Sequence, residues 1–514
     1  MVRRLLATGA LVLLGLGTFV CDEAGNTASS GGDGDSDGDS DGDGDSDTDG
    51  DSDSDSDSDS GSDTNTDPSK ADSDGDGLSD QYENKIGTDP NKPDTDGDGV
   101  SDLAEVVAGT DPLDPNSNPQ KEGNFYFTVP YKEPPEPLDD SLVFSTNIQM
   151  ADLFILIDNT ASMTMAINKL KAGLRTVIIP QVADIIPDVW FGLGHFEDYP
   201  NEVYGSTSAG DKVFTLVQRT TNDAVAAENA VKTLKVHDGA DPSEAQVPAL
   251  WATATGLGLG LYLPDATGCA ADEIGYPCFR PGAVPIIMII TDSPFHNGPG
   301  NYDPYSGLTP TPPTYAEALT ALNGIHAKVM AIKSTMPFGI SPPLTKTHLN
   351  RIATDTGTVD ASNKPLVYDV NANGVGLDSD VVDAVATLAS QTPMAISAVA
   401  RDDTTDGVDA TVFIDHISPS TAGGTEDPEK PGVICVGGLE VEDDNGDSVP
   451  DMFPTVKAGT PVCFDIFVKK NETVQSSAKP EVYMAYVDVI GDNHTVLDTR
   501  EVYFLVPPSS PVVE

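Results

Sequence analysis

Residues 152–162 read "DLFILIDNTAS" and join a buried-strand run to a polar turn. The apolar run ends at Asp158, and the following segment 167–178, "INKLKAGLRTVI", is typical of a helix. Further strand-like runs cover 189–196, 213–217, 285–292 and 327–333, and Ala-rich helical segments cover 224–234, 246–263, 315–325 and 378–389. This alternation predicts an α/β domain with a doubly wound, mostly parallel sheet.

Candidate metal ligands follow two of these expected strands. Asp158, Thr160 and Ser162 come after the first run, and Asp292 ends the run 285–292. Ligands of doubly wound sheets gather at the carboxyl ends of the strands. Carboxylates and hydroxyls that meet there form a hard-oxygen site suited to Mg²⁺, Mn²⁺ or Ca²⁺. The alternative is that both aspartates only cap strand–helix turns.

With these motifs, residues 141–391 resemble a von Willebrand factor A (VWA) domain. The metal-ion-dependent adhesion site of that family is D-x-S-x-S with a distant Thr and Asp, and Thr160 here replaces a serine but keeps the hydroxyl. The middle loop 237–251, "HDGADPSEAQVPALW", resembles the D-x-P-E loop of integrin β-type A domains, although Pro242 comes one position early. The resemblance implies Glu244 as a ligand. It also implies that the bound ion accepts an acidic residue of a protein partner, as in adhesion rather than catalysis.

Calcium loops precede this domain. An EF-hand-like loop takes oxygens from positions 1, 3, 5, 7 and 9, needs Gly at 6, and closes with a bidentate Glu at 12. The segment 72–83, "DSDGDGLSDQYE", supplies Asp72, Asp74, Asp76, the Leu78 carbonyl, Asp80 and Glu83. The segment 94–105, "DTDGDGVSDLAE", supplies Asp94, Asp96, Asp98, the Val100 carbonyl, Asp102 and Glu105. Both loops are complete.

The tract 33–59 before these loops alternates Asp with Gly, Ser or Thr, so an odd-numbered start never places an acid at position 12. Residues 69–119 resemble bacterial thrombospondin type 3-like repeats, which implies a semi-rigid spacer filled with Ca²⁺. The alternative is more acidic linker. Residues 22–68 read as a disordered Asp/Ser/Gly stalk, and residues 120–140 as a Pro-rich join.

Residues 395–509 change to runs of alternating Val, Phe and Tyr, which predict an antiparallel β-sandwich. Within it, the segment 443–451 has calcium spacing, with Ser448 at position 6 and Pro454 at position 12 as departures. Its candidate ligands are Asp443, Asn445, Asp447, the Val449 carbonyl and Asp451. A calcium loop and a plain polar turn both remain open.

Charge and cysteines indicate the compartment. The 514 residues include 83 Asp+Glu against 27 Lys+Arg, a net charge of -56, which excludes nucleic acid as a natural partner. Residues 1–21 have the charged and then apolar layout of a secretion signal. Cys21 resembles the acylated cysteine of bacterial lipoproteins, but Val20 departs from that pattern, so a lipid tether at the outer surface and ordinary cleavage both stay open. The other cysteines predict disulfides between Cys269 and Cys278 and between Cys435 and Cys463.

Together these features predict a secreted or surface-tethered bacterial calcium-binding protein with a metal-dependent adhesion domain. One alternative is a structural cell-surface protein whose A domain binds no ligand. Another is a metal-dependent hydrolase, for which His195 and His296 near strand ends are the candidate bases or ligands. H-E-x-x-H does not occur, and G-x-S-x-G occurs only inside the acidic tract, at residues 34–38 and 38–42.

Overall fold

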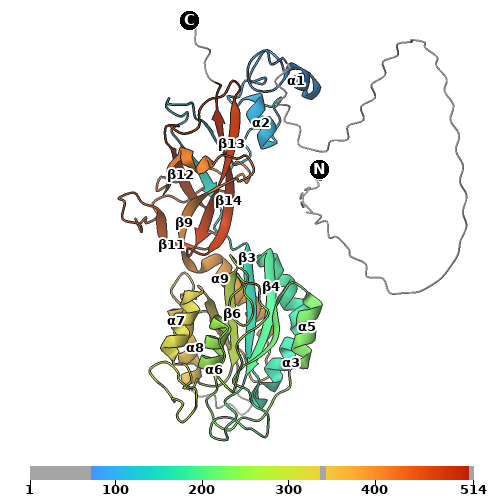
Figure 1. Cartoon of the computed structure of the whole chain (residues 1–514). Helices are drawn as coiled ribbons and strands as arrows, with labels where there is room; N and C mark the ends of the chain where they lie inside the picture. The colour runs from blue at the N-terminus through green and yellow to red at the C-terminus, as the bar shows by residue number, and fades with distance from the viewer. Residues whose placement is uncertain (1–70, 336–342, 509–514) are drawn as a thin grey trace, which may run out of the picture. The chain divides into compact units, whose positions relative to one another are not determined.

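The computed structural model describes residues 71–335 and 343–508 (Figure 1). The expected signal segment, Cys21 and the acidic stalk lie outside these residues. Within them, no helix is both long and apolar enough to cross a membrane.

The α/β domain is built on one six-stranded sheet. Its strands, in spatial order, are β5 (Thr215–Thr221), β4 (Asp188–Phe196), β3 (Met150–Asp158), β6 (Val284–Thr291), β7 (Lys328–Lys333) and β8 (Val367–Asp369). Only β5 runs antiparallel to its neighbour; the other pairings are parallel. The predicted doubly wound fold is confirmed.

Helices cover both faces of this sheet (Figure 1). On one face lie α3 (Thr164–Gly173), η2 (Leu174–Ile178), α4 (Ile179–Ile185), α5 (Ala224–Thr233) and α9 (Leu377–Gln391). On the other lie α6 (Gln246–Thr255), α7 (Tyr315–Gly324) and α8 (Pro343–Asp355). Both faces of β3 are therefore buried, which explains its unbroken apolar run. The parallel strands β3 and β6 end at the same sheet edge, so Asp158 and Asp292 lie close together.

The helix expected over 246–263 ends early. Gly256 takes a left-handed conformation at φ 70° and caps α6. A Cβ at Gly258 would lie 2.5 Å from the Leu263 carbonyl oxygen. The glycine-rich segment after Gly256 therefore forms a turn in place of further helix.

The second domain consists of two packed sheets. The five-stranded sheet has the order β1 (Phe125–Thr128), β14 (Thr495–Val506), β13 (Glu481–Gly491), β9 (Pro393–Asp402) and β11 (Met452–Lys457). The three-stranded sheet has the order β10 (Ile414–Pro419), β12 (Val462–Val468) and β2 (Asp139–Phe144), with the short helix η3 (Ala410–Phe413) before β10. Phe125 and Phe144 join the two sheets with ring centres 6.3 Å apart. The Cys435–Cys463 disulfide forms as expected.

Strands β1 and β2 were not expected in this domain. They fall in the segment read as a join and in the first residues assigned to the α/β domain. In the structure, β1 runs parallel to β14 and β2 runs antiparallel to β12. Pairing between strands so far apart in sequence leaves no local signal. The α/β domain is therefore an insertion between two strands of the sandwich.

The calcium-loop region, expected to be a semi-rigid spacer, packs on this sandwich. Its helices are α1 (Asp80–Ile86) and α2 (Asp102–Ala108). Val100 and Ala104 are buried in one apolar cluster with Tyr126 of β1 and Tyr503 of β14. The second loop is thus anchored to the five-stranded sheet.

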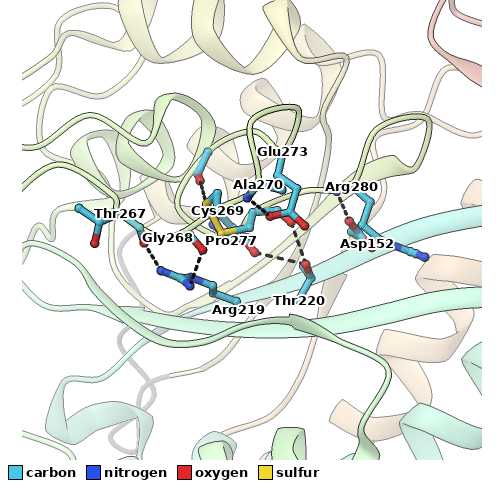
Figure 2. Close-up of a disulfide and its surroundings, with 12 residues drawn as sticks. Asp152, Arg219, Thr220, Thr267, Gly268, Cys269, Ala270, Glu273, Pro277 and Arg280 are labelled. Atoms are coloured by element: carbon cyan, nitrogen blue, oxygen red, sulfur yellow. Dashed lines mark hydrogen bonds and ion pairs between the residues drawn. A yellow bond between two sulfur atoms is a disulfide. The ribbon is translucent and has the colours of Figure 1, made fainter. Parts of the chain in front are cut away.

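A disulfide loop and an arginine secure the start of β3 (Figure 2). Cys269 and Cys278 are bonded as predicted, and Arg219 donates hydrogen bonds to the carbonyls of Thr267 and Gly268, which directly precede the enclosed loop. Just beyond the loop, Arg280 Nε lies 2.8 Å from Oδ1 of Asp152, which is fully buried. Burial raises the pKa of Asp152, and Arg280 opposes that rise. Arg280 also pairs with Asp188 at 2.9 Å.

Arg280→Ala is expected to lower the free energy of unfolding of the α/β domain by about 3–5 kcal/mol, because it leaves the buried Asp152 carboxylate without its cationic partner. The chain has two tryptophans, Trp190 and Trp251, and both belong to this domain, so denaturant unfolding followed by tryptophan fluorescence reports on it alone. Arg351→Ala is the control: Arg351 pairs with Asp355 on the surface, and its loss should change stability by less than about 1 kcal/mol. Equal effects of the two variants would contradict the role of Arg280.

Candidate metal centres

The ligands predicted after β3 and β6 form one hydrogen-bonded group. Thr160 Oγ1 donates to Asp158 Oδ1 at 2.6 Å and lies 3.2 Å from Ser162 Oγ. Ser162 Oγ in turn donates to Asp292 Oδ1 at 3.1 Å. The other Asp158 oxygen accepts from Thr291 Oγ1 at 2.7 Å. Residues from two strands and one short turn, η1 (Ala161–Met163), therefore converge at this sheet edge.

The middle loop reaches the same edge. The amide of Glu244 donates to the Pro294 carbonyl at 3.0 Å, and the Glu244 carbonyl accepts from the His296 amide at 3.0 Å. A Cβ built on Gly239 would lie 3.2 Å from Glu244 Oε1 and 3.7 Å from Thr160 Cγ2, so the glutamate and the threonine flank the same glycine. Asp158, Thr160, Ser162 and Asp292 thus form one linked set, and Glu244 lies close enough to interact with the charge of Asp158.

Electrostatics at this location favour a cation. Burial and the nearby Asp292 carboxylate raise the pKa of Asp158 to about 7. Burial, followed by repulsion from Asp158, also holds the pKa of Glu244 well above its usual range. Asp292 Oδ2 is buried and has no hydrogen-bond donor among the described residues. A divalent cation would stabilise these ionised carboxylates, and the donor set of carboxylates and hydroxyls suits Mg²⁺, Mn²⁺ or Ca²⁺.

Beside it lies a second group that was not predicted as a set. Asp198, Asp241 and His296 offer ligand atoms that all lie within 4.8 Å of one another. His296 Nε2 is 2.9 Å from Asp241 Oδ2 and 3.5 Å from Asp198 Oδ2. Burial lowers the pKa of His296, but Asp241 and Asp198 outweigh that effect and raise it to about 9. Asp198 lies two residues after the end of β4 at Phe196. The rule that ligands gather at the carboxyl ends of parallel strands, which predicted Asp158, could therefore also have found Asp198.

His195 does not join the metal ligands. Its Nδ1 lies 3.2 Å from Oε1 of the buried Glu197, and His237 Nδ1 lies 3.3 Å from the same oxygen. Burial raises the pKa of Glu197, but its hydrogen bond and charge interaction with His195 prevail, and the net shift is downward. His195 therefore lies against the Glu197 carboxylate and outside the proposed ligand set.

The two calcium loops share one geometry. In the second loop, the amides of Gly97 and Gly99 donate to Asp94 at 2.7 and 3.0 Å, and the Val100 amide donates to Asp98 at 2.9 Å. In both loops the glycine at position 6 is left-handed, at φ 105° for Gly77 and 102° for Gly99. Asp102, at position 9, accepts from the Thr95 amide at 2.9 Å. Asp72, Asp74, Asp76, Leu78, Asp80 and Glu83 occupy the matching positions of the first loop, where Gly75 donates to Asp72 and Ser73 to Asp80.

The glutamates at position 12 of the two loops are buried without a compensating partner among the described residues. Glu83 and Glu105 are fully buried, and neither oxygen of either side chain has a hydrogen-bond partner among the described residues. Burial, then repulsion from neighbouring aspartates, raises the pKa of Glu83 to about 7 and of Glu105 to about 8. Buried carboxylates of this kind need protons or a cation, and the oxygen-only donor set fits Ca²⁺.

The third candidate loop, residues 443–451, has the same turn, but its aspartates are not buried. Asp443 accepts from the amides of Gly446 and Ser448, Asp447 accepts from Val449, and Asp451 accepts from Asp444. Ser448 adopts φ 76°, so it takes the left-handed conformation that glycine has in the other loops. Calcium binding by Asp443, Asn445, Asp447, Val449 and Asp451 stays a prediction.

Glu105→Gln is expected to remove one calcium ion, or to weaken one site by at least about tenfold, because the amide supplies one neutral oxygen in place of a bidentate carboxylate. Calorimetric titration of the full chain measures the stoichiometry. Asp114→Asn serves as the control, since Asp114 lies in the trailing segment outside the ligand positions. Unchanged binding in Glu105→Gln would contradict calcium closure by this residue.

Comparison with known proteins matches residues 72–93 and 94–115 to the bacterial TSP3 repeat. None of the curated proteins matches the chain. Among solved structures, the chain is similar to a von Willebrand factor type A protein from Catenulispora acidiphila, with 13% identity and a TM-score of 0.32 over 76% of this chain and 73% of that one.

Two further structures are similar over part of their own length. The pilus adhesin SpaC from Lactobacillus rhamnosus GG has 11% identity and a TM-score of 0.29, with 72% of this chain and 46% of that one covered. Proximal thread matrix protein 1 from the mussel byssus has 13% identity and a TM-score of 0.28, with 50% of each chain covered. This chain thus spans about half the length of both. Given its repeat matches, its strand order and the Asp158 motif, the chain carries two bacterial TSP3 repeats at residues 72–115 and a VWA-like α/β domain.

Proposed function

We propose that this protein is an extracytoplasmic, calcium-binding adhesion protein whose α/β domain binds a protein partner through a divalent ion. Asp158, Thr160, Ser162, Glu244 and Asp292 hold the ion, and the partner supplies an acidic side chain as the final ligand. The observation that carries the proposal is the linked set Asp158–Thr160–Ser162–Asp292 at the ends of two adjacent parallel strands.

The chemistry supports recognition of an acidic group. A protein with a net charge of -56 repels acidic partners in general. A cation with an open coordination position reverses that repulsion at one point, so metal and partner bind together. The linked set consists of carboxylates and hydroxyls, the hard-oxygen donors that hold a divalent cation, which supports binding through an ion.

The TSP3 repeats and disulfides support an extracytoplasmic location. With calcium bound, the repeats stabilise the edge of the sandwich against which Val100 and Ala104 pack. They thereby present the α/β domain from a fixed base. Tethering through a lipid on Cys21 belongs to this proposal as one route to the cell surface.

The proposal is tested by capture of partners from bacterial surface extracts on the full chain in Mg²⁺ and in EDTA. Partners should be retained in Mg²⁺ and lost in EDTA or with Asp158→Ala, because the ion loses its buried carboxylate ligand. Asp184→Asn, an exposed acid on α4, is the matched control and should retain them. Tryptophan fluorescence verifies that each variant is folded. The same partner set under all conditions would disprove metal-dependent recognition and favour a purely structural surface protein.

A further inference from the structure

The group formed by Asp198, Asp241 and His296 lies outside the ligand set of the proposed ion site. Its members come from three separate segments: Asp198 follows β4, Asp241 lies in the middle loop 237–251, and His296 follows β6. Asp198 and His296 are almost fully buried, whereas the Asp241 side chain is 23% exposed. Their candidate ligand atoms all lie within 4.8 Å of one another. The fold therefore places one imidazole and two carboxylates around a single point that borders solvent at Asp241.

The His296 ring turns one nitrogen toward the two carboxylates. Its other nitrogen, Nδ1, lies 2.8 Å from the backbone carbonyl oxygen of Asp303. A carbonyl oxygen only accepts, so Nδ1 carries a proton and donates it there. Nε2 then faces Asp241 Oδ2 at 2.9 Å and Asp198 Oδ2 at 3.5 Å. A ring N–H held by a carbonyl, with the other nitrogen directed at further ligands, is the usual arrangement of a metal-bound histidine.

Asp198 is oriented in a similar way by groups behind it. Its Oδ1 accepts hydrogen bonds from the Tyr199 amide at 2.6 Å and from the Tyr305 hydroxyl at 2.7 Å. Its Oδ2 is buried and has no hydrogen-bond partner among the described residues. Asp241 Oδ1 is also buried without such a partner. The protein thus holds one oxygen of Asp198 and leaves the other, on the side of His296, for a ligand.

The spacing and the charges of the group suit an ion. Zinc lies about 2.0–2.2 Å from histidine nitrogen and carboxylate oxygen, so its tetrahedral ligand atoms are about 3.4 Å apart. The two separations from His296 Nε2 bracket that value. Burial raises the pKa of Asp198 to about 8, although the charge of His296 opposes the rise. His296 alone therefore compensates the buried carboxylate incompletely, and a divalent cation would complete the compensation.

The imidazole determines which ion fits. Ca²⁺ and Mg²⁺ take oxygen ligands, whereas imidazole suits Zn²⁺ and related transition-metal ions. We propose that Asp198, Asp241 and His296 form a separate metal centre that binds one transition-metal ion of the zinc type, with water completing its coordination. This centre is distinct from the ion held by Asp158, and it does not depend on the proposed function.

Zinc binding to the full chain tests the proposal, with a chromogenic chelator as competitor and with excess Ca²⁺ and Mg²⁺ to fill the oxygen sites. We expect one Zn²⁺ per chain, retained by the wild type and by Asp158→Ala. His296→Gln and Asp241→Asn should each weaken this site by at least about tenfold, because even a group behind a metal ligand contributes that much to affinity. His416→Gln is the matched control and should behave as wild type, since His416 pairs with Asp415 at the surface of the other domain. Tryptophan fluorescence verifies that each variant is folded.

The outcomes also separate this centre from the proposed adhesion site. If the wild type retains no Zn²⁺, or if His296→Gln and Asp241→Asn retain it as tightly as the wild type, the proposal is overturned. The group would then be an ion-paired cluster with a protonated His296. Loss of Zn²⁺ in Asp158→Ala would assign the ion to the adhesion site and overturn the separate centre. Capture of partners in Mg²⁺ is measured independently, so the proposed function stands or falls without these results.

Discussion

The structure depends on how it accommodates buried carboxylates with few cationic partners. Glu83, Glu105, Asp158, Glu244 and Asp292 are fully or almost fully buried, and several of their oxygens accept no hydrogen bond from the described residues. Such groups strongly disfavour folding while ionised unless a cation compensates them. Asp152 shows the other solution, because Arg280 compensates it within the protein.

The two kinds of metal centre meet this constraint in different ways. In the TSP3 repeats, one short segment wraps its own carboxylates around a point, and the left-handed Gly77 and Gly99 make the turn. In the α/β domain, the candidate ligands come from three separate segments that the parallel sheet and the Glu244–Pro294 hydrogen bond bring together. The first centre is local, whereas the second exists only when the whole domain is folded. The proposed partner binding at the second centre is therefore expected to be coupled to domain stability.

Local features were predictable from the sequence, and long-range ones were predictable only in part. The repeat ligands follow from fixed spacing, and Asp158 and Asp292 follow from the rule that parallel strands end at one edge. Asp198 was missed although the same rule applies after β4, and its proximity to His296, at 3.5 Å, is visible only in the structure. Strands β1 and β2 gave no signal, since their partners are far away in sequence. Gly256 ended α6 earlier than the Ala-rich pattern indicated.

Thermal unfolding followed by tryptophan fluorescence, in Mg²⁺ and in EDTA, tests the central claim most directly. The pKa of Asp158 in the ion-free folded domain is raised from 3.8 to about 7. The protonated carboxyl therefore stabilises the fold fully only at a pH below the unfolded-state pKa, and this stabilisation is lost as the pH rises through about 7. At about pH 8, Mg²⁺ should therefore raise the unfolding temperature by roughly 5 °C over EDTA. At about pH 5 the difference should shrink, because protons replace the ion. Equal unfolding temperatures in Mg²⁺ and EDTA at about pH 8 would contradict the claim that a cation compensates the buried carboxylates.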